Sequence, residues 1–108
     1  MGKWGRYRMS VIHLDKEDFN DIISNGKVVV DFFATWCGPC KMLGPVFEKV
    51  SDEVNDVKFV KLDVDKFNDI AREYGVMSVP TLILFENGKE IRKEIGFMSE
   101  DKLKDFIG

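Results

Sequence analysis

The chain of 108 residues has two cysteines, three positions apart in the segment Cys37-Gly38-Pro39-Cys40. They lie where an apolar, strand-like run gives way to a helical pattern. Positions i and i+3 of a helix share a face, so the two sulfurs can meet with little movement of the backbone. The first-turn N–H groups and the helix dipole favour an anion, so we expect a lowered pKa for the Cys37 thiol. Cys40, one turn further, is expected to be more buried and less acidic, and this asymmetry suits thiol–disulfide exchange.

Three other interpretations of the pair compete with exchange chemistry. A structural disulfide is weakly supported, because a loop of four residues stabilises the fold by only about 2 kcal/mol. A zinc site requires four ligands, and only these thiols and the lone His13 are available. Two inert buried cysteines are disfavoured by the Gly38-Pro39 pair at the start of a helix. Redox exchange is therefore the favoured interpretation.

Asp31 interrupts an apolar run six residues before Cys37. Val29 and Phe33 share its face of the predicted strand, which favours burial over the alternative that Asp31 points to water. Burying a lone carboxylate is costly, so the pKa of Asp31 should rise and the group should hold a proton near neutrality. Asp31 is therefore a candidate for proton transfer.

The elements that must position these residues follow from hydrophobic periodicity and turn signals. They predict the order β-α-β-α-β-α-β-β-α, with strands at 11–14, 28–34, 57–63, 81–85 and 90–95. Helices are expected after Asp15 as a cap, at 37–54, from Asp65 to a stop at Gly75, and after Ser99 as a cap. Asn87-Gly88 predicts a hairpin turn in which both residues have positive φ. The pattern is that of one α/β domain, with helices flanking a mixed sheet.

Charge and length narrow the classes of partner. The net charge of −3 argues against a strongly basic nucleic-acid footprint, and no apolar run approaches the roughly 18 residues of a membrane span. Residues 1–10 contain three cations and no acid, and we expect a flexible basic extension ahead of a domain at 11–108. A wrongly extended start before Met9 and a partner-binding arm are the alternatives. The segment leads into VIHLDKEDF rather than an apolar stretch, so no secretory signal is expected.

The segment Val30–Met42, which contains Trp36-Cys37-Gly38-Pro39-Cys40-Lys41, resembles the active site of the thioredoxin family. The resemblance spans roughly residues 11–107 and includes Lys61, Asp65, Val79-Pro80-Thr81, Asn87-Gly88 and Gly96 in the family's order. It implies the thioredoxin fold, a central mixed five-stranded sheet flanked by four helices. The chain departs from the family at Phe33, where tryptophan is usual, and at Thr35 and Met77-Ser78. These departures border the docking surface and bear on the choice of partner.

The resemblance also assigns roles to single residues. It implies that Cys37 attacks a substrate disulfide, that Cys40 resolves the mixed disulfide, and that Lys61 pairs with the buried Asp31 in a proton relay. Val79–Pro80 is expected to be a cis peptide, and the main chain of Val79 to bond the partner. The implied docking surface for an extended substrate segment comprises Trp36, Gly38, Pro39, Val79, Pro80, Ile95 and Gly96.

The expected function is that of a cytoplasmic protein-disulfide reductase without a bound cofactor. Pro39 adds no charge between the thiols, which favours a reductant over an oxidant. The expected partners are disulfide-containing proteins and a thioredoxin reductase, with no nucleic acid or membrane, and the chain is expected to be a monomer. Two alternatives remain open: a binding module in which redox turnover is incidental, and an oxidase or isomerase of the same fold.

Overall fold

The computed structural model describes residues 10–108, and the predicted order of elements is confirmed there. Of the predicted basic extension, residues 1–9 lie outside the described residues. The described elements are β1 (Val11–His13), α2 (Phe19–Ile23), β2 (Lys27–Phe33), α3 (Gly38–Glu53), β3 (Val57–Asp63), α4 (Asn68–Glu73), β4 (Thr81–Glu86), β5 (Lys89–Ile95) and α5 (Glu100–Ile107).

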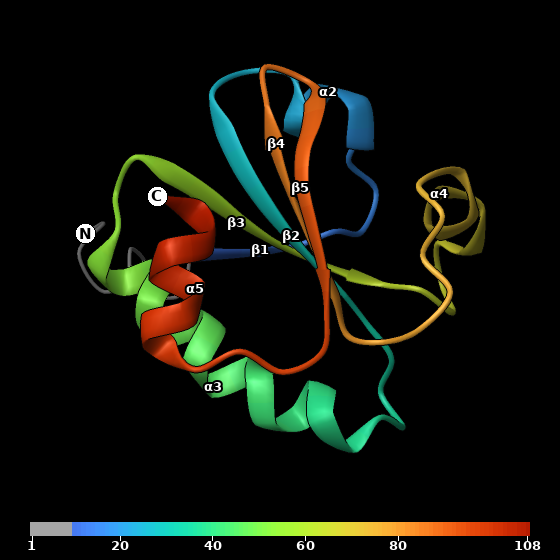
Figure 1. Cartoon of the computed structure of the whole chain (residues 1–108). Helices are drawn as coiled ribbons and strands as arrows, with labels where there is room; N and C mark the ends of the chain where they lie inside the picture. Colours follow the sequence, from blue (N-terminus) through green and yellow to red (C-terminus); the bar gives the residue numbers. More distant parts are fainter. Residues whose placement is uncertain (1–9) are drawn as a thin grey trace, which may run out of the picture.

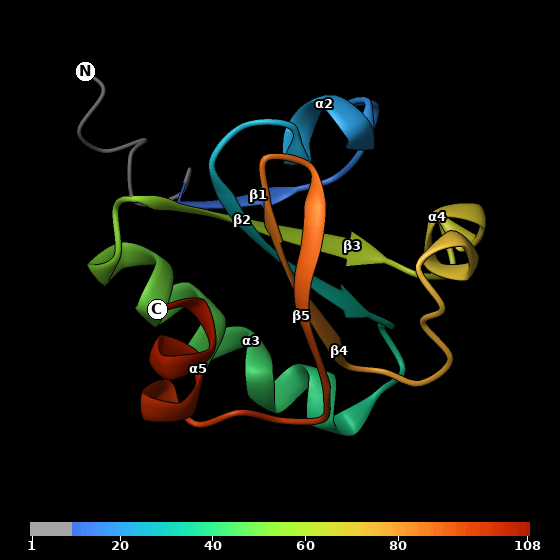
Figure 2. The same cartoon turned by 45° about the horizontal axis from the view of Figure 1, so that its top comes forward.

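The strands form one mixed sheet in the order β1-β3-β2-β4-β5 (Figures 1 and 2). β3 runs parallel to both β1 and β2, whereas β4 is antiparallel to β2 and to β5. Because β2 lies at the centre, the chain leaves the middle of the sheet to enter α3. The carboxyl ends of β2 and β3 lie at the same edge, and the residues that follow these two strands can therefore meet.

Helices cover both faces of the sheet. α3 and α5 lie together on one face, whereas α2 and α4 lie on the other (Figure 1). The core under α3 and α5 joins Leu43, Phe47, Val50, Leu103 and Phe106 to Val29, Phe59, Leu82 and Leu84 of the sheet. The opposite core joins Phe19, Ile23 and Ala71 to Val28, Val30, Phe32, Val60, Leu62, Ile83 and Phe85.

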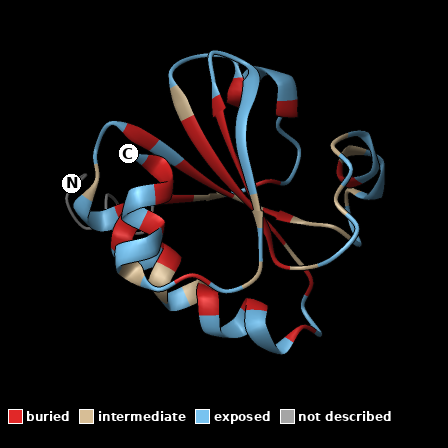
Figure 3. Cartoon of the chain, viewed as in Figure 1, coloured by how far each residue is buried: buried red, intermediate tan, exposed pale blue. Residues whose placement is uncertain are grey.

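Burial differs sharply between the central and edge strands (Figure 3). All residues of β2 except its two ends are buried, as expected of an apolar strand covered on both faces. The hairpin strand β5 is exposed along almost its whole length, which agrees with its charged sequence and its edge position. The turn between β4 and β5 has φ of 50° at Asn87 and 87° at Gly88, which confirms the predicted hairpin.

The predicted cap of α2 and the predicted start of α4 are wrong. Asp18, not Asp15, caps α2, because its side chain accepts a hydrogen bond from the N–H of Asn20 at 2.9 Å. α4 begins at Asn68 rather than after Asp65, since residues 64–67 first make turns against the end of β3. The N–H of Asp65 donates to the carboxylate of Asp63 at 2.9 Å. The N-cap residue of α4 is Phe67, and no side chain caps this helix. Ser99 caps α5 as predicted.

Candidate active site

Cys37 and Cys40 form a disulfide across the first turn of α3, with their Cα atoms 5.3 Å apart. Cys37 is the N-cap residue of this helix, and its sulfur accepts a hydrogen bond from the N–H of Cys40 at 3.2 Å. Pro39 is the second residue of the helix, where the missing N–H of proline costs no helical hydrogen bond. The helix start thus holds the two sulfurs within bonding reach, as their spacing predicted.

The two cysteines differ less in burial than expected. Cys37 is 5% exposed and Cys40 is 2% exposed, so the order agrees with the prediction but neither residue is open to water in the disulfide form. The sulfur of Cys37 lies 3.6 Å from the carbonyl oxygen of Val79. Val79 and Phe33 also pack against the cluster formed by both cysteines and Ala34. The sulfur of Cys37 therefore lies beside the main chain of Val79.

Asp31 lies inside the sheet on β2 and is fully buried. Neither of its carboxylate oxygens has a hydrogen-bond partner among residues 10–108. Burial raises the pKa of Asp31 from 3.8 to about 7, and the positive charge of Lys61 partly opposes this shift. The carboxyl group can therefore exchange a proton near neutral pH, as the sequence predicted.

Lys61 is the direct neighbour of Asp31 on β3, but it makes no hydrogen-bonded ion pair with it. Its ammonium nitrogen lies 4.4 Å from the centre of the Phe33 ring. Lys61 therefore acts on the carboxyl through space. Asp31 and Lys61, the two residues of the relay that the resemblance implied, are neighbours in the sheet. The ammonium of Lys61, however, lies over the ring of Phe33.

The predicted docking residues differ in how far they are exposed. Trp36 and Ile95 are 70% and 64% exposed, and Gly38 and Pro39 are also exposed. Val79 and Gly96 are half-buried. The Val79–Pro80 peptide is cis, as expected, but Pro80 itself is buried. The carbonyl of Pro80 accepts a hydrogen bond from the N–H of Gly96 at 2.8 Å, so Pro80 joins two segments of the surface from below.

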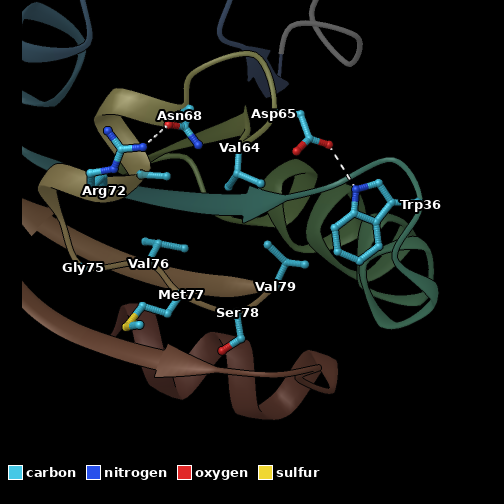
Figure 4. Close-up of a pocket in the computed structure, with 11 residues that line it drawn as sticks. Trp36, Val64, Asp65, Asn68, Arg72, Gly75, Val76, Met77, Ser78 and Val79 are labelled. Carbon is cyan, nitrogen blue, oxygen red and sulfur yellow. Dashed lines mark hydrogen bonds between the residues drawn. The ribbon is translucent and has the colours of Figure 1, made fainter.

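A cleft of about 790 Å³ opens beside Trp36 and includes residues that the sequence did not single out for docking. Figure 4 shows Trp36 on one side, Met77, Ser78 and Val79 on the other, and Arg72 at the end remote from Trp36. Met77 is 94% exposed. The indole N–H of Trp36 donates to the carboxylate of Asp65 at 3.0 Å, which fixes the ring at the mouth of the cleft.

Asp65 could have been found from the topology rather than from its own neighbours. It follows the end of β3, and Trp36 follows the end of β2, which is the parallel neighbour of β3. The sequence predicted that a helix opens at Asp65, because this residue stands before an apolar helical pattern, and it did not predict the contact with Trp36.

The competing metal site has no support among the described residues. Residues 10–108 contain no group of three or more His, Cys, Asp or Glu side chains that could hold a metal ion. His13 is exposed on the edge strand β1. No helix in this part of the chain is long and apolar enough to cross a membrane.

Comparison with known proteins places this geometry in a family. The thioredoxin family model matches residues 10–108. A thioredoxin of Mycoplasmoides gallisepticum is 49% identical over 94 residues, which cover 86% of this chain and 94% of the relative. The structure of a mutant thioredoxin from Halobacterium salinarum NRC-1 is similar with a TM-score of 0.84 at 40% identity, covering 90% of this chain and 87% of that one.

Oxidised mitochondrial thioredoxin 3 from Saccharomyces cerevisiae gives a TM-score of 0.83 at 42% identity, over 94% of this chain and 96% of that one. Thioredoxins are thiol–disulfide oxidoreductases, and this chain has a disulfide between Cys37 and Cys40 across the start of a helix. The chain therefore belongs to the thioredoxin family and is a thiol–disulfide oxidoreductase.

Proposed function

We propose that this chain reduces disulfides in other proteins through the dithiol form of Cys37 and Cys40. The observation that carries the proposal is the disulfide at the first turn of α3, next to the exposed ring of Trp36. A bond between two residues of one helical turn opens and closes with little movement of the fold. An exposed aromatic side chain beside a reactive sulfur is typical of a surface that contacts partners.

The reaction proceeds in two exchange steps. The Cys37 thiolate attacks one sulfur of the substrate disulfide, a mixed disulfide forms, and the other substrate sulfur leaves as a thiolate. The thiol of Cys40 then loses its proton, and its sulfur attacks the sulfur of Cys37. The second substrate thiolate leaves, and this chain is left with the Cys37–Cys40 disulfide. Two electrons have passed from the dithiol to the substrate.

Asp31 is proposed as the group that takes the proton from Cys40. A buried carboxyl with a pKa of about 7 is suited to accept and return a proton near neutral pH. Asp31 lies on the strand that leads into the cysteine segment, and its oxygens are not engaged by any donor among residues 10–108. Lys61 contributes a positive charge that favours the ionised carboxylate.

An extended segment of the substrate is proposed to lie across Trp36, Gly38, Pro39, Val79, Ile95 and Gly96. The exposure of Trp36 and Ile95 supports this placement, and the main chain of Val79 lies beside the sulfur that reacts. Pro80, also expected in this surface, is itself buried, and its carbonyl oxygen accepts the hydrogen bond from Gly96.

The proposed partners are disulfide-containing proteins and a thioredoxin reductase that returns two electrons and two protons. We propose a cytoplasmic monomer without a bound cofactor, in which residues 11–108 form the redox domain and residues 1–10 a basic extension. Two cysteines that form one reversible disulfide are consistent with a reducing compartment, where such bonds are usually catalytic.

Reduction of insulin disulfides with dithiothreitol as the electron source tests the function. The unaltered chain should accelerate the reaction, and Cys37→Ser should abolish the acceleration. Cys40→Ser, reduced first and then mixed with insulin after dithiothreitol is removed, should instead accumulate a mixed disulfide that is visible on a non-reducing gel, because the resolving sulfur is missing. Circular dichroism of both variants shows whether the fold is intact. Full activity of the variant that lacks both thiols would favour the binding module instead.

A further inference from the structure

Phe33 contacts two parts of the site. Its ring lies under the Lys61 ammonium, 4.4 Å from the nitrogen to the ring centre. The same side chain packs against the cluster of Ala34, Cys37 and Cys40. Phe33 therefore contacts both the lysine and the sulfur pair, whereas the sequence indicated only that it shares the face of Asp31 and departs from the family pattern.

The ring gives the ammonium a defined place near the carboxyl. A cation over the face of an aromatic ring is attracted to the electron-rich face, and the attraction grows as water is removed. Lys61 is half-buried, and α3 approaches it from another side, where a Cβ added to Gly44 would lie 3.7 Å from the ammonium nitrogen. The ring and the helix thus confine the charge next to the strand position of Asp31.

The contact also separates two possible roles of the lysine. An ammonium that donated a hydrogen bond to Asp31 would hold the carboxylate in its charged form, but neither oxygen of Asp31 has a partner among residues 10–108. An ammonium extended into water would influence the carboxyl much less, because the Coulomb attraction falls with distance and with the higher dielectric constant. The position over Phe33 lies between these two cases.

We propose that Phe33 is a positioning residue for the proton transfer, whose ring holds the Lys61 ammonium close to Asp31 without bonding to it. This inference rests on the proposed role of Asp31 as the proton acceptor of Cys40. It assigns a function to the aromatic ring that adjoins the sulfurs. The required feature is the aromatic face rather than the exact shape of phenylalanine.

Removal of the ring has a defined consequence. In Phe33→Leu the volume stays apolar but the attraction to the cation is lost, and the lysine extends towards water, where its charged end is better solvated. The ionised form of Asp31 then loses part of its stabilisation. The midpoint of the Asp31 titration should move up by roughly half a pH unit, as expected for moving one charge a few ångströms away.

The other groups near Asp31 define the conditions of the test. On β3, Asp63 lies on the same face as Lys61, and on β4 the neighbour of Asp31 is the apolar Leu82. From α3, Cys37 and Cys40 titrate only when the disulfide is reduced. The titration is therefore carried out on the oxidised protein. Asp63→Asn, introduced into the unaltered chain and into Phe33→Leu, shows whether the Asp63 carboxylate contributes to the midpoint of the Asp31 titration.

The experiment is a carbon-detected NMR titration of the Asp31 carboxyl in the oxidised protein. Phe33→Leu should raise the midpoint, and Lys61→Met should raise it further. Phe33→Trp, which keeps an aromatic face, should stay close to the unaltered chain. In the Lys61→Met background, Phe33→Leu should cause no further change, because the charge that the ring positions is absent.

Three results would overturn the inference: no change in Phe33→Leu, a change equal in Phe33→Trp and Phe33→Leu, or the same change with and without Lys61. Each would show that the side chain matters only for packing or not at all. The titration needs no catalytic turnover, so its outcome is independent of the insulin assay. If the chain failed to reduce insulin, the titration of Asp31 could still be measured. If the titration did not change in Phe33→Leu, the insulin assay would still test the reductase function.

Discussion

Ionisable side chains lie in two contrasting places of this fold, at the surface beside the end of α5 and in the buried centre of β2. At the end of α5, Arg92 of β5 donates to the carbonyl oxygen of Phe106 at 2.6 Å and to that of Gly108 at 3.3 Å. Lys27 of β2 reaches the carbonyl oxygen of Ile107 at 3.2 Å. Beneath the disulfide, by contrast, the buried carboxyl of Asp31 has no hydrogen-bond partner among residues 10–108.

The cations that have hydrogen-bond partners stabilise the fold, whereas the carboxyl without a partner is suited to chemistry. The last carbonyl groups of a helix have no partner within the helix, and cations there bond them and complement the helix dipole. Both charged groups at the end of α5 therefore stabilise the fold. The isolated carboxyl does the reverse when it ionises, because burial without a partner destabilises the charged form. In the proposed function, the proton that this carboxyl exchanges gives the buried group a chemical role.

The largest effect is expected at Asp31. Its pKa is raised from 3.8 to about 7, so the folded state binds a proton more tightly than the unfolded state does. The stabilisation that this proton provides is complete at low pH and is lost as the pH rises from about 4 to about 7. Relative to Asp31→Asn, the unaltered chain should lose on the order of 3 kcal/mol of unfolding free energy between pH 4 and pH 8.

Urea unfolding of the oxidised protein at a series of pH values measures this loss. Asp56→Asn, at an exposed position between α3 and β3, serves as the matched control and should follow the unaltered chain. If Asp31→Asn kept the same pH dependence as the unaltered chain, the buried carboxyl would not be the source of the effect and the comparison would fail.

An intermediate effect is expected at the other region. Arg92→Met keeps much of the side-chain volume but removes the donors to the end of α5, and it should cost about 1–2 kcal/mol of unfolding free energy. The cost should be the same at pH 5 and pH 8, and insulin reduction should not change. Lys89→Met on the same strand is the control for loss of one exposed positive charge. Equal losses in both variants would mean that the carbonyl contacts add nothing.

The smallest effect is expected at Asp18, a surface carboxylate that accepts a hydrogen bond from the N–H of Asn20. Asp18→Ala removes the cap of α2 and should lower the unfolding free energy by about 1 kcal/mol or less. Asp15→Ala, at the position that the sequence favoured for the cap, should change it by less than about 0.5 kcal/mol. Thermal unfolding of the pair measures the difference. A larger loss in Asp15→Ala would restore the original assignment.

Much of the fold and the core of the site could be predicted because their signals are local. β3 was predicted with its exact bounds, and Ser99 and the Asn87-Gly88 turn were identified correctly, since a cap or a tight turn depends on residues within a few positions. The cysteine pair lies within one helical turn. The wrong cap of α2 arose where Asp15 and Asp18 stand close together and local preference does not choose between them. The start of α4 was misplaced because no side chain caps this helix.

The details of the site that were missed join residues far apart in the chain. Asp65 bonds Trp36 across 29 positions, and Pro80 is covered although the resemblance placed it on the docking surface. The burial of Asp31 could be inferred from its strand, but the place of the Lys61 ammonium over Phe33 could not. Such contacts depend on which strands are neighbours and in what register.

The amino-acid sequence by itself determined the order of the elements, the reach between the two sulfurs and the thiol–disulfide chemistry, because periodicity, turn residues and the spacing within one helical turn act over short distances. Only the tertiary structure decided which polar groups found partners. The order of strands brings Arg92 to the end of α5 and leaves the carboxyl of Asp31 enclosed beside a lysine that does not bond it. A hydrogen bond forms or fails over less than an ångström, a distance that packing sets.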